Sequence, residues 1–576
     1  MDADNPFEYE AALSLKRERI SSWFIDDYNY ARFIRSSRNV ILNGDRGSGK
    51  TMILAYYSAD NEIATAKREE RDFDTSYIGI YVPCNNPLLK KPEHDTLEPS
   101  RRDIISERYL IYTISSAIAK TMACLSEFLT PAEKEAILDE FSYLLPDVNL
   151  SDIEEPFVYL SRFIRSRLRA DQEALARGLE FEFNFETSSF FVLIMPILAA
   201  LREADAFSKS HFSLLLDDAH MLDSYQQAIL NSWLGYRDHS LFSLKVAIAG
   251  IRNYNFKTAY GGAILNGHDF TFVSLYRPFH SLESEYGKFV KRVVERRLKD
   301  IGVPVSATDF FPANTNFVRD LERAKERADQ LAQERGIDSS DRRAVGDFRY
   351  KFARALYFRD RSRRANRPPY SGFETITHLS TGVVRNLLNL CYTMFEKQQS
   401  KQKGRVPKRI DPEIQSQAIL EASDDQWKFV KEELDRSIPH CTPQDTLWIS
   451  NLLTRLAEYF RTRLLTHYSE PRVLVFSISG LDRDLHDRLL RLLHLAEEAQ
   501  LVYVRTGVAK SGGGRENYYV LNRILFPAYG LDVQGQNGRA SLKADDLLAA
   551  AEQNKPIPVA AEDDEGNLPQ GDLFDV

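Results

Sequence analysis

The residues from Gly44 to Thr51 have the types and the spacing of a phosphate-binding loop, G-x-x-x-x-G-K-T. Glycines let the backbone curl so that its amides point at phosphate oxygens, and a following helix adds its positive N-terminal end. In such a loop Lys50 reaches the β- and γ-phosphates, and the Thr51 hydroxyl binds Mg²⁺. We expect the whole loop to contact nucleotide: Gly44, Asp45, Arg46, Gly47, Ser48, Gly49, Lys50 and Thr51.

The second half of such a site is an acidic residue at the end of a hydrophobic strand. The apolar run 214–216 ends in Asp217 and Asp218. We interpret Asp217 as the residue that supports the metal, and Asp218 as the general base that polarises the attacking water. Asp218 is one methylene shorter than the Glu usual in fast ATPases, which predicts slow hydrolysis. His211 and His220 flank the pair without a third ligand at a metal spacing, so we interpret them as strand-end and turn histidines rather than zinc ligands.

Strands alternating with helices must position these residues. Short β-branched and aliphatic runs predict buried strands at 39–43, 77–82, 212–216, 245–249 and 270–275. Helical patterns lie between them at 52–57, at 103–177 with breaks near Pro131 and Pro146, and at 188–201. This alternation predicts an α/β fold whose parallel sheet is covered on both faces.

After Pro278 the sequence is mostly helical and highly charged. The segment 317–335 is typical of an exposed helix laced with ion pairs. Near the C-terminus, a helix is expected at 442–466, a strand at 472–476, a second helix at 484–499 and a hairpin from 501–504 and 518–521 around a glycine tip. Helices followed by a hairpin predict a winged-helix domain.

These motifs resemble the AAA+ ATPases, and within them the origin-recognition initiator group and its uncharacterised prokaryotic relatives. The run 216–220 is similar to their Walker B motif, and 249–253 to their sensor-1 turn, which implies that Asn253 faces the γ-phosphate. The segment 380–387 looks like the sensor-2 helix of the lid, which implies that Arg385 leans over the phosphates. A turn-capping role for Asn253 and a surface role for Arg385 stay open. The resemblance implies ATP and Mg²⁺ as ligands; ATP rather than GTP rests on it alone.

The resemblance also implies a domain order. We expect an N-terminal helical leader at 1–37, an α/β P-loop AAA+ base with a helical insertion at 38–276, a helical lid at 277–425, a C-terminal winged-helix domain at 426–531 and an acidic disordered tail at 532–576. The chain departs from the group in one place, because 257–269 contains no arginine that could reach a neighbouring subunit's nucleotide. Either Lys257 or Arg252 substitutes for it, or activation between subunits is lost.

Two classes of function fit these features. One is an ATP-dependent switch that binds duplex DNA through the winged helix, whose wing carries Arg505, Lys510, Arg515 and Arg523. The other is a signalling ATPase that controls a separate effector, as in prokaryotic antiviral defence or toxin-type gene pairs, with the winged helix as a protein-docking module. Both classes fit a homo-oligomer.

The composition limits the remaining partners. The net charge of −8 and pI of about 5.9 exclude a basic protein that coats nucleic acid. The longest apolar run, 190–201, is too short to span a bilayer, so we expect no membrane partner and a cytoplasmic location. The segment 570–574, with Gln570, Leu573 and Phe574, resembles the short motif that docks on bacterial sliding clamps. An unremarkable tail is the alternative.

Overall fold

The computed structural model describes residues 5–8, 15, 17–85, 92–142, 149–150, 153–177, 189–236, 241–277, 279, 281–363, 368–466, 472–508, 514–534 and 538–559. Contacts divide the chain into two compact units. The first unit is Tyr9–Tyr276, and the second unit combines Met1–Glu8 with Arg277–Val576. Each unit is described by itself.

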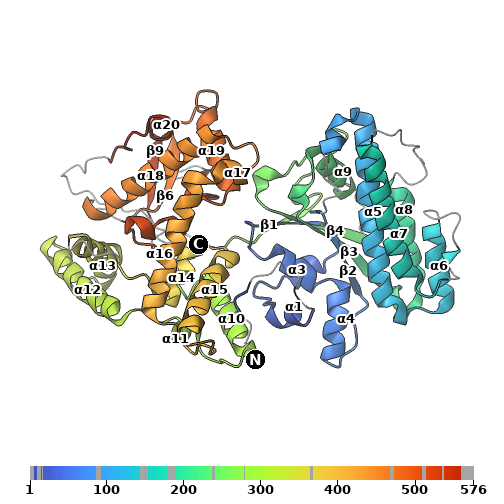
Figure 1. The fold of residues 1–576 in the computed structure, drawn as a ribbon, viewed down its shortest axis with the longest axis horizontal. Coiled ribbons are helices and arrows are strands. Elements are labelled where there is room, and N and C mark those ends of the chain that lie inside the picture. The colour runs from blue at the N-terminus through green and yellow to red at the C-terminus, as the bar shows by residue number, and fades with distance from the viewer. Residues whose placement is uncertain are drawn as a thin grey trace. The chain divides into compact units, whose positions relative to one another are not determined.

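The first unit is built around a five-stranded sheet of order β2-β3-β4-β1-β5 (Figure 1). All of its neighbouring strands are parallel. The strands are β1 (Val40–Asn43), β2 (Tyr77–Pro83), β3 (His211–Asp217), β4 (Phe242–Ile248) and β5 (Thr271–Ser274). The predicted parallel α/β fold is therefore confirmed, and β1, which leads into the phosphate loop, lies between β4 and β5.

Both faces of this sheet are buried, because side chains alternate between two apolar cores. Val40 and Leu42 of β1 face one core, whereas Ile41 faces the other. In β3, Leu215 likewise faces one core, whereas Leu214 and Leu216 on either side of it face the other. Gly79 lies where the end of helix α3 (Lys50–Tyr56) approaches β2, and a Cβ there would come within 2.1 Å of the Tyr57 carbonyl oxygen. Only glycine fits this contact.

Helices cover both faces. The helices before the insertion are α1 (Arg17–Trp23), α2 (Ala31–Ile34), α3 (Lys50–Tyr56) and α4 (Ala59–Arg68). The insertion between β2 and β3 consists mainly of α5 (Pro99–Leu125), α6 (Pro131–Ser142), α7 (Pro156–Ala176) and α8 (Phe190–Glu203), and α9 (Ser224–Leu234) follows β3. Helices α5, α7 and α8 pack together beside the sheet (Figure 1). Three of the insertion helices begin with proline, whose fixed φ suits a first helical turn.

The second unit begins with a helical region. Its helices are α10 (Glu285–Asp300), α11 (Ala307–Phe310), α12 (Thr315–Glu334), α13 (Arg342–Arg363), α14 (Phe373–Leu379), α15 (Val384–Lys401) and α16 (Pro412–Glu432). Helices α12 and α13 form an antiparallel hairpin around the buried rings of Phe348 and Phe352. Its surface carries ion pairs such as Arg349–Asp329, as the charge pattern of α12 predicts.

A second, four-stranded sheet of order β7-β8-β6-β9 completes this unit. Helix α18 (Pro443–Thr466) precedes β6 (Val475–Ser479), and α19 (Asp487–Glu498) precedes the hairpin of β7 (Val502–Val508) and β8 (Arg515–Leu521). This order of helices and hairpin is consistent with a winged helix. The expected boundary between Asp425 and Gln426 is wrong, because α16 runs through it without a break.

The expectation that the chain is disordered from residue 532 is also wrong. Strand β9 (Arg539–Lys543) pairs in parallel with β6, and α20 (Ala544–Gln553) packs on α18. The Asn451 side chain donates 3.0 Å to the Ala551 carbonyl oxygen. Alternating buried residues in β9 and apolar positions in α20 give this segment a core face, which its overall polarity hides. Residues 560–576 lie outside the described residues.

The segment Asn5–Glu8, which we call the N-terminal hook, belongs to the second unit and not to a leader of the first. Phe7 is fully buried, with its ring centroid 5.8–6.2 Å from those of Phe310, Phe311 and Phe395. The Arg297 guanidinium donates to the carbonyl oxygens of Pro6 and Glu8 at 3.0 and 3.1 Å. The hook is thus a fixed part of the helical region.

Candidate nucleotide-binding site

The phosphate loop joins the end of β1 to the start of α3, as its motif requires. Gly47 and Gly49 have φ values of 85° and 99°, a left-handed backbone region that favours glycine. A Cβ on Gly44 would lie 2.5 Å from Ser48 Oγ, so a side chain there would displace the Ser48 hydroxyl. The Gly44 amide donates to the Ile248 carbonyl oxygen of β4 at 3.2 Å. The loop is therefore anchored to the centre of the sheet.

Lys50 is the first residue of α3 and is buried, with 5% of its surface exposed. Its ammonium group donates to the carbonyl oxygens of Gly44 and Asp45 at 2.9 and 3.0 Å, which holds the charge within the loop. Ser48 Oγ and Asn43 Oδ1 are buried at the same place without a hydrogen-bond partner among the described residues. Because buried polar atoms normally have hydrogen-bond partners, these two atoms are available to a polar ligand bound in the loop.

Asp217 ends β3 and is 1% exposed. Its Oδ2 accepts a 2.7 Å hydrogen bond from the Tyr81 hydroxyl, whereas its Oδ1 is buried without a hydrogen-bond partner in the described part of the chain. Burial and the Asp218 charge raise the pKa of Asp217, and Tyr81, Thr51 and Lys50 oppose that rise. An orphaned carboxylate oxygen beside a threonine hydroxyl is a donor set that suits Mg²⁺.

Asp218 follows in a left-handed conformation, with φ at 55°. Asp tolerates this conformation, and the chain continues from it into a short 3₁₀ helix, Ala219–Met221. The Asp218 side chain is partly exposed, and its Oδ2 accepts a 3.3 Å hydrogen bond from the Asn85 amide. Adjacent aspartates thus have different surroundings, one buried beside the loop and one open to solvent.

The flanking histidines lie at opposite ends of β3. His211 begins the strand and bonds to Ser243 Oγ at 2.9 Å. His220 lies in the turn beyond it, where burial and the charges of Lys50 and Arg46 lower its pKa to about 3. Its Nδ1 is buried without a hydrogen-bond partner among the described residues. No group of at least three His, Cys, Asp or Glu side chains that could hold a metal ion occurs in the described ranges.

Helix α9 positions the loop that contains Asn253. Gln227 donates 2.7 Å to the Leu222 carbonyl oxygen and accepts 2.7 Å from the Asn255 amide, which joins the turn after β3 to the loop after β4. Asn231 donates 2.9 Å to the Lys257 carbonyl oxygen. Asn253 itself is exposed, and its side chain donates 3.2 Å to the Ala249 carbonyl oxygen. Hydrogen bonds from α9 therefore hold this loop, and the Asn253 side chain remains exposed to solvent.

Arg385 lies in the second unit, at the second position of α15, and its side chain is exposed. Its neighbour Asn386 is fixed by bonds to the Ser380 carbonyl oxygen and the Tyr503 hydroxyl, at 3.3 and 3.1 Å. The start of α15 is therefore firmly attached to the C-terminal sheet, and Arg385 projects from a rigid base.

The cations expected on the wing do not all lie on a surface. Arg523 is 1% exposed and donates to His378 Nδ1 and to the Val533 carbonyl oxygen at 2.7 and 2.9 Å. It is a core residue, so its assignment to the wing is wrong. Arg515 is exposed at the start of β8, and Lys510 lies outside the described residues. Arg483, before α19, is a second exposed cation.

Several positioning residues escape sequence motifs. Tyr81 and Asn85 reach Asp217 and Asp218 from β2 and the residues after it, and Gln227 and Asn231 lie on the inner face of α9. Their positions follow from strand order, which places β2 beside β3. Sequence periodicity shows that these elements exist, but it does not show which strands are neighbours.

A parallel sheet with this strand order, a phosphate loop after β1 and paired aspartates after β3 defines an AAA+ ATPase fold. The sequence model of the ORC-CDC6-like family matches residues 5–348 and 336–542, which together cover almost the whole chain. The chain therefore belongs to the ORC-CDC6-like family.

Comparisons with solved structures and with curated proteins add no functional detail beyond the family. One solved structure that matches is described as the Aeropyrum pernix ORC2 protein in ADPNP-ADP complexes. It is 11% identical, with 96% of this chain and 97% of that chain covered and a TM-score of 0.28, so the two whole chains superpose poorly. No curated protein matches the chain. No described helix is both long and apolar enough to cross a membrane.

Proposed function

We propose that this protein is an ATP-dependent switch that binds ATP and Mg²⁺ and hydrolyses ATP slowly. The observation that carries the proposal is the buried Lys50 in a glycine loop beside the orphaned Oδ1 of Asp217. Lys50 and the backbone amides of 44–51 hold the phosphates, and Thr51 and Asp217 hold the metal. When bound, Mg²⁺ supplies charge neutralisation at the phosphate oxygens.

Asp218 accepts the proton of the attacking water in this proposal, since it is the solvent-facing member of the pair. Its shorter side chain places the carboxylate farther from the phosphate than a glutamate would, which supports a slow reaction. Asn253 and Arg385 are the proposed sensors of the γ-phosphate. Those two roles rest on the motifs and on the exposure of both side chains.

We also propose that the C-terminal sheet and α19 bind duplex DNA. Arg515 and Arg483 are the exposed cations that support it, whereas Arg488 and Arg491 pair with Glu552 and Asp445. Cations on a winged helix contact backbone phosphates and release counterions, so affinity falls steeply with salt. Self-association through the first unit fits the family, with Arg252 or Lys257 as the candidate that acts on a neighbouring subunit.

The test is duplex binding, followed by fluorescence anisotropy over a range of salt concentrations with ATP, ADP or no nucleotide. The Arg483→Ala plus Arg515→Ala variant is compared with Lys67→Ala, which removes an exposed cation of the first unit. We expect the double variant to reduce the slope of log affinity against log salt by about 1 per lost phosphate contact. No duplex binding at low salt in any nucleotide state would instead favour the signalling class, in which the switch controls a separate effector.

A second partner is proposed for the C-terminal residues, on sequence grounds alone. Gln570, Leu573 and Phe574 match a sliding-clamp docking peptide. Burial of two such apolar side chains contributes roughly 1.5–3 kcal/mol each before ordering costs, which limits a single peptide to weak binding. Interferometry with a purified bacterial clamp tests this, and binding that survives Leu573→Ala plus Phe574→Ala would exclude the motif.

A further inference from the structure

The hydroxyl of Tyr81 donates a 2.7 Å hydrogen bond to Asp217 Oδ2. Tyr81 pairs with Leu215 in the register of β2 and β3, two residues before Asp217. Side chains at registered positions of neighbouring parallel strands point to the same face, so Tyr81 and Asp217 share a face of the sheet. The ring therefore runs along the strands and delivers its hydroxyl to the carboxylate.

This bond leaves the two carboxylate oxygens of Asp217 unequal. Oδ2 is occupied by Tyr81 at 2.7 Å, and the buried Oδ1 has no hydrogen-bond partner within the described ranges. A carboxylate held by one directional bond on one oxygen cannot rotate freely about its own axis. The bond thus determines which oxygen is presented to a ligand in the phosphate loop.

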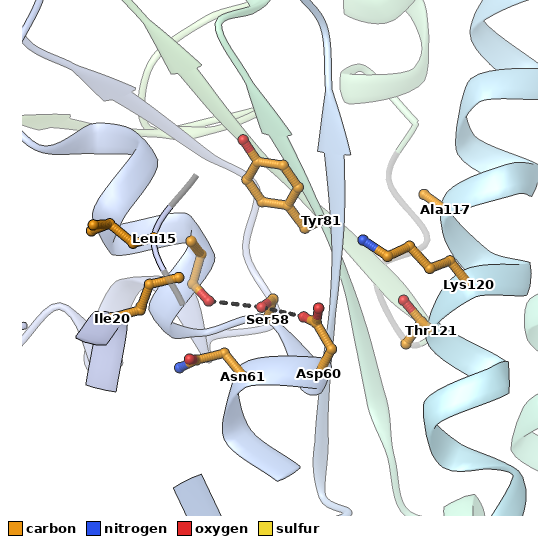
Figure 2. Close-up of a pocket in the computed structure, with 10 residues that line it drawn as sticks. Leu15, Ile20, Ser58, Asp60, Asn61, Tyr81, Ala117, Lys120 and Thr121 are labelled. Atoms are coloured by element: carbon orange, nitrogen blue, oxygen red, sulfur yellow. Dashed lines mark hydrogen bonds between the residues drawn. The ribbon is translucent and has the colours of Figure 1, made fainter. Parts of the chain in front are cut away.

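The Tyr81 ring packs against the apolar core that includes Tyr77 and Leu215, but not on all sides. One side of the ring borders a cavity of about 180 Å³ (Figure 2). Ala117 and Lys120 of α5 form another part of the cavity wall, together with Ser58 just before α4 and Asp60 within it. A side chain that borders open space on one side has fewer contacts to hold it, so the hydrogen bond to Asp217 adds to packing in orienting the ring.

We propose that Tyr81 is a positioning residue for the magnesium ion of bound ATP, which acts by holding Oδ2 of Asp217 so that Oδ1 faces the metal. Hydrogen bonds from outside the ligand shell orient metal ligands in this way. The inference rests on the proposed function, since it assumes that ATP and Mg²⁺ bind at the phosphate loop. It adds a residue from β2 that belongs to neither the phosphate-loop motif nor the aspartate pair.

The experiment uses the full chain, with ATP and Mn²⁺ as probes. Mn²⁺ affinity in the presence of ATP is measured by electron paramagnetic resonance, and ATP affinity without metal by equilibrium dialysis in EDTA. Tyr81→Phe removes the hydroxyl and keeps the ring. We expect Mn²⁺ affinity to fall roughly 10–100-fold, the usual cost of losing a partner of a metal ligand. Metal-free ATP affinity should stay within about twofold.

Tyr225→Phe is the matched control. Its hydroxyl also donates to an aspartate, Asp223 Oδ2 at 3.1 Å, at the start of α9. The control should leave both affinities unchanged. An unchanged Mn²⁺ affinity in Tyr81→Phe would overturn the inference, as would an equal loss of metal-free ATP binding, which indicates a general structural role. Absence of ATP binding by the unaltered chain would instead overturn the proposed function, and this inference with it.

Discussion

The side-chain amide of Asn85 donates a 3.3 Å hydrogen bond to Oδ2 of Asp218, so a residue just after β2 holds the carboxylate that follows β3. An asparagine at 218 could still accept this bond through its carbonyl oxygen. Asp218→Asn therefore removes the charge and the basicity while it preserves the local geometry. That makes it a clean probe of the proposed general base.

We expect Asp218→Asn to retain ATP binding and to lose hydrolysis by roughly 10²–10⁴-fold, the range that a general base contributes. Phosphate release over hours and equilibrium ATP binding measure the two effects. Asp205→Asn, which changes an exposed aspartate before β3, is the control and should hydrolyse normally. Undiminished hydrolysis in Asp218→Asn would remove Asp218 from the mechanism.

Lys50→Ala should weaken ATP binding by roughly 100-fold, because charged hydrogen bonds to phosphate contribute about 1.5–3 kcal/mol each. Arg46→Ala is the matched comparison from the same loop. Arg46 is exposed, and its guanidinium lies 3.9 Å from the Met221 sulfur. Isothermal titration calorimetry should show that Arg46→Ala keeps most of the affinity; equal losses in both variants would contradict the assigned roles.

Asp532→Asn should destabilise the second unit by about 3–5 kcal/mol, the usual cost of breaking a buried ion pair. Arg354 and Asp532 bond at 2.6 Å with only 13% and 1% of their side chains exposed, and Arg472 contacts Asp532 at 3.2 Å. Asp329→Asn is the control, because the Arg349–Asp329 pair has similar geometry but is 45% and 31% exposed. It should cost about 0.2–1 kcal/mol in urea unfolding.

The same residue predicts a pH dependence. Burial alone would raise the pKa of Asp532, but the charges of Arg354 and Arg472 outweigh burial and hold it below its usual value. A depressed folded-state pKa stabilises the fold above the unfolded value of about 4, and the contribution is lost as pH falls through the folded value. The difference in unfolding free energy between the unaltered chain and Asp532→Asn should therefore shrink below about pH 4. A difference that persists there would contradict the ion-pair explanation.

Phe7→Ala should destabilise the second unit by about 3–5 kcal/mol, since it empties a fully buried aromatic site. Phe191→Ala changes a phenylalanine that is 41% exposed on α8 and should cost much less. Thermal unfolding followed by circular dichroism compares the two. Equal small effects would show that the N-terminal hook contributes little to stability.

Sequence patterns predicted the parts of the fold that local chemistry determines. The glycine loop with Lys50 is one continuous segment, the two aspartates are neighbours in the sequence, and each strand of the first sheet is a short apolar run. Features that depend on distant pairing were missed or misjudged. The sequence suggests that Arg523 is a wing cation, but the turn after β8 places it against His378. Tyr81 contacts Asp217 only because β2 lies beside β3.

Composition misled in the same way near the C-terminus. Residues beyond 531 are polar on average, yet β9 finds a partner in β6 and α20 finds one in α18. A short strand with two buried side chains carries little signal by itself, because its stability comes from the sheet edge that it joins.

The N-terminal hook also affects how the chain is made. Asn5 donates to Glu396, a residue 391 positions later. At about 5–20 residues per second, roughly 20–80 s of translation separate the synthesis of the two partners. During that interval the ring of Phe7 has no complete binding site, and synthesis of the first unit, Tyr9–Tyr276, finishes before that site exists. The hook is thus made before the first unit but docks after it, and the nascent chain exposes an apolar segment that chaperones can bind.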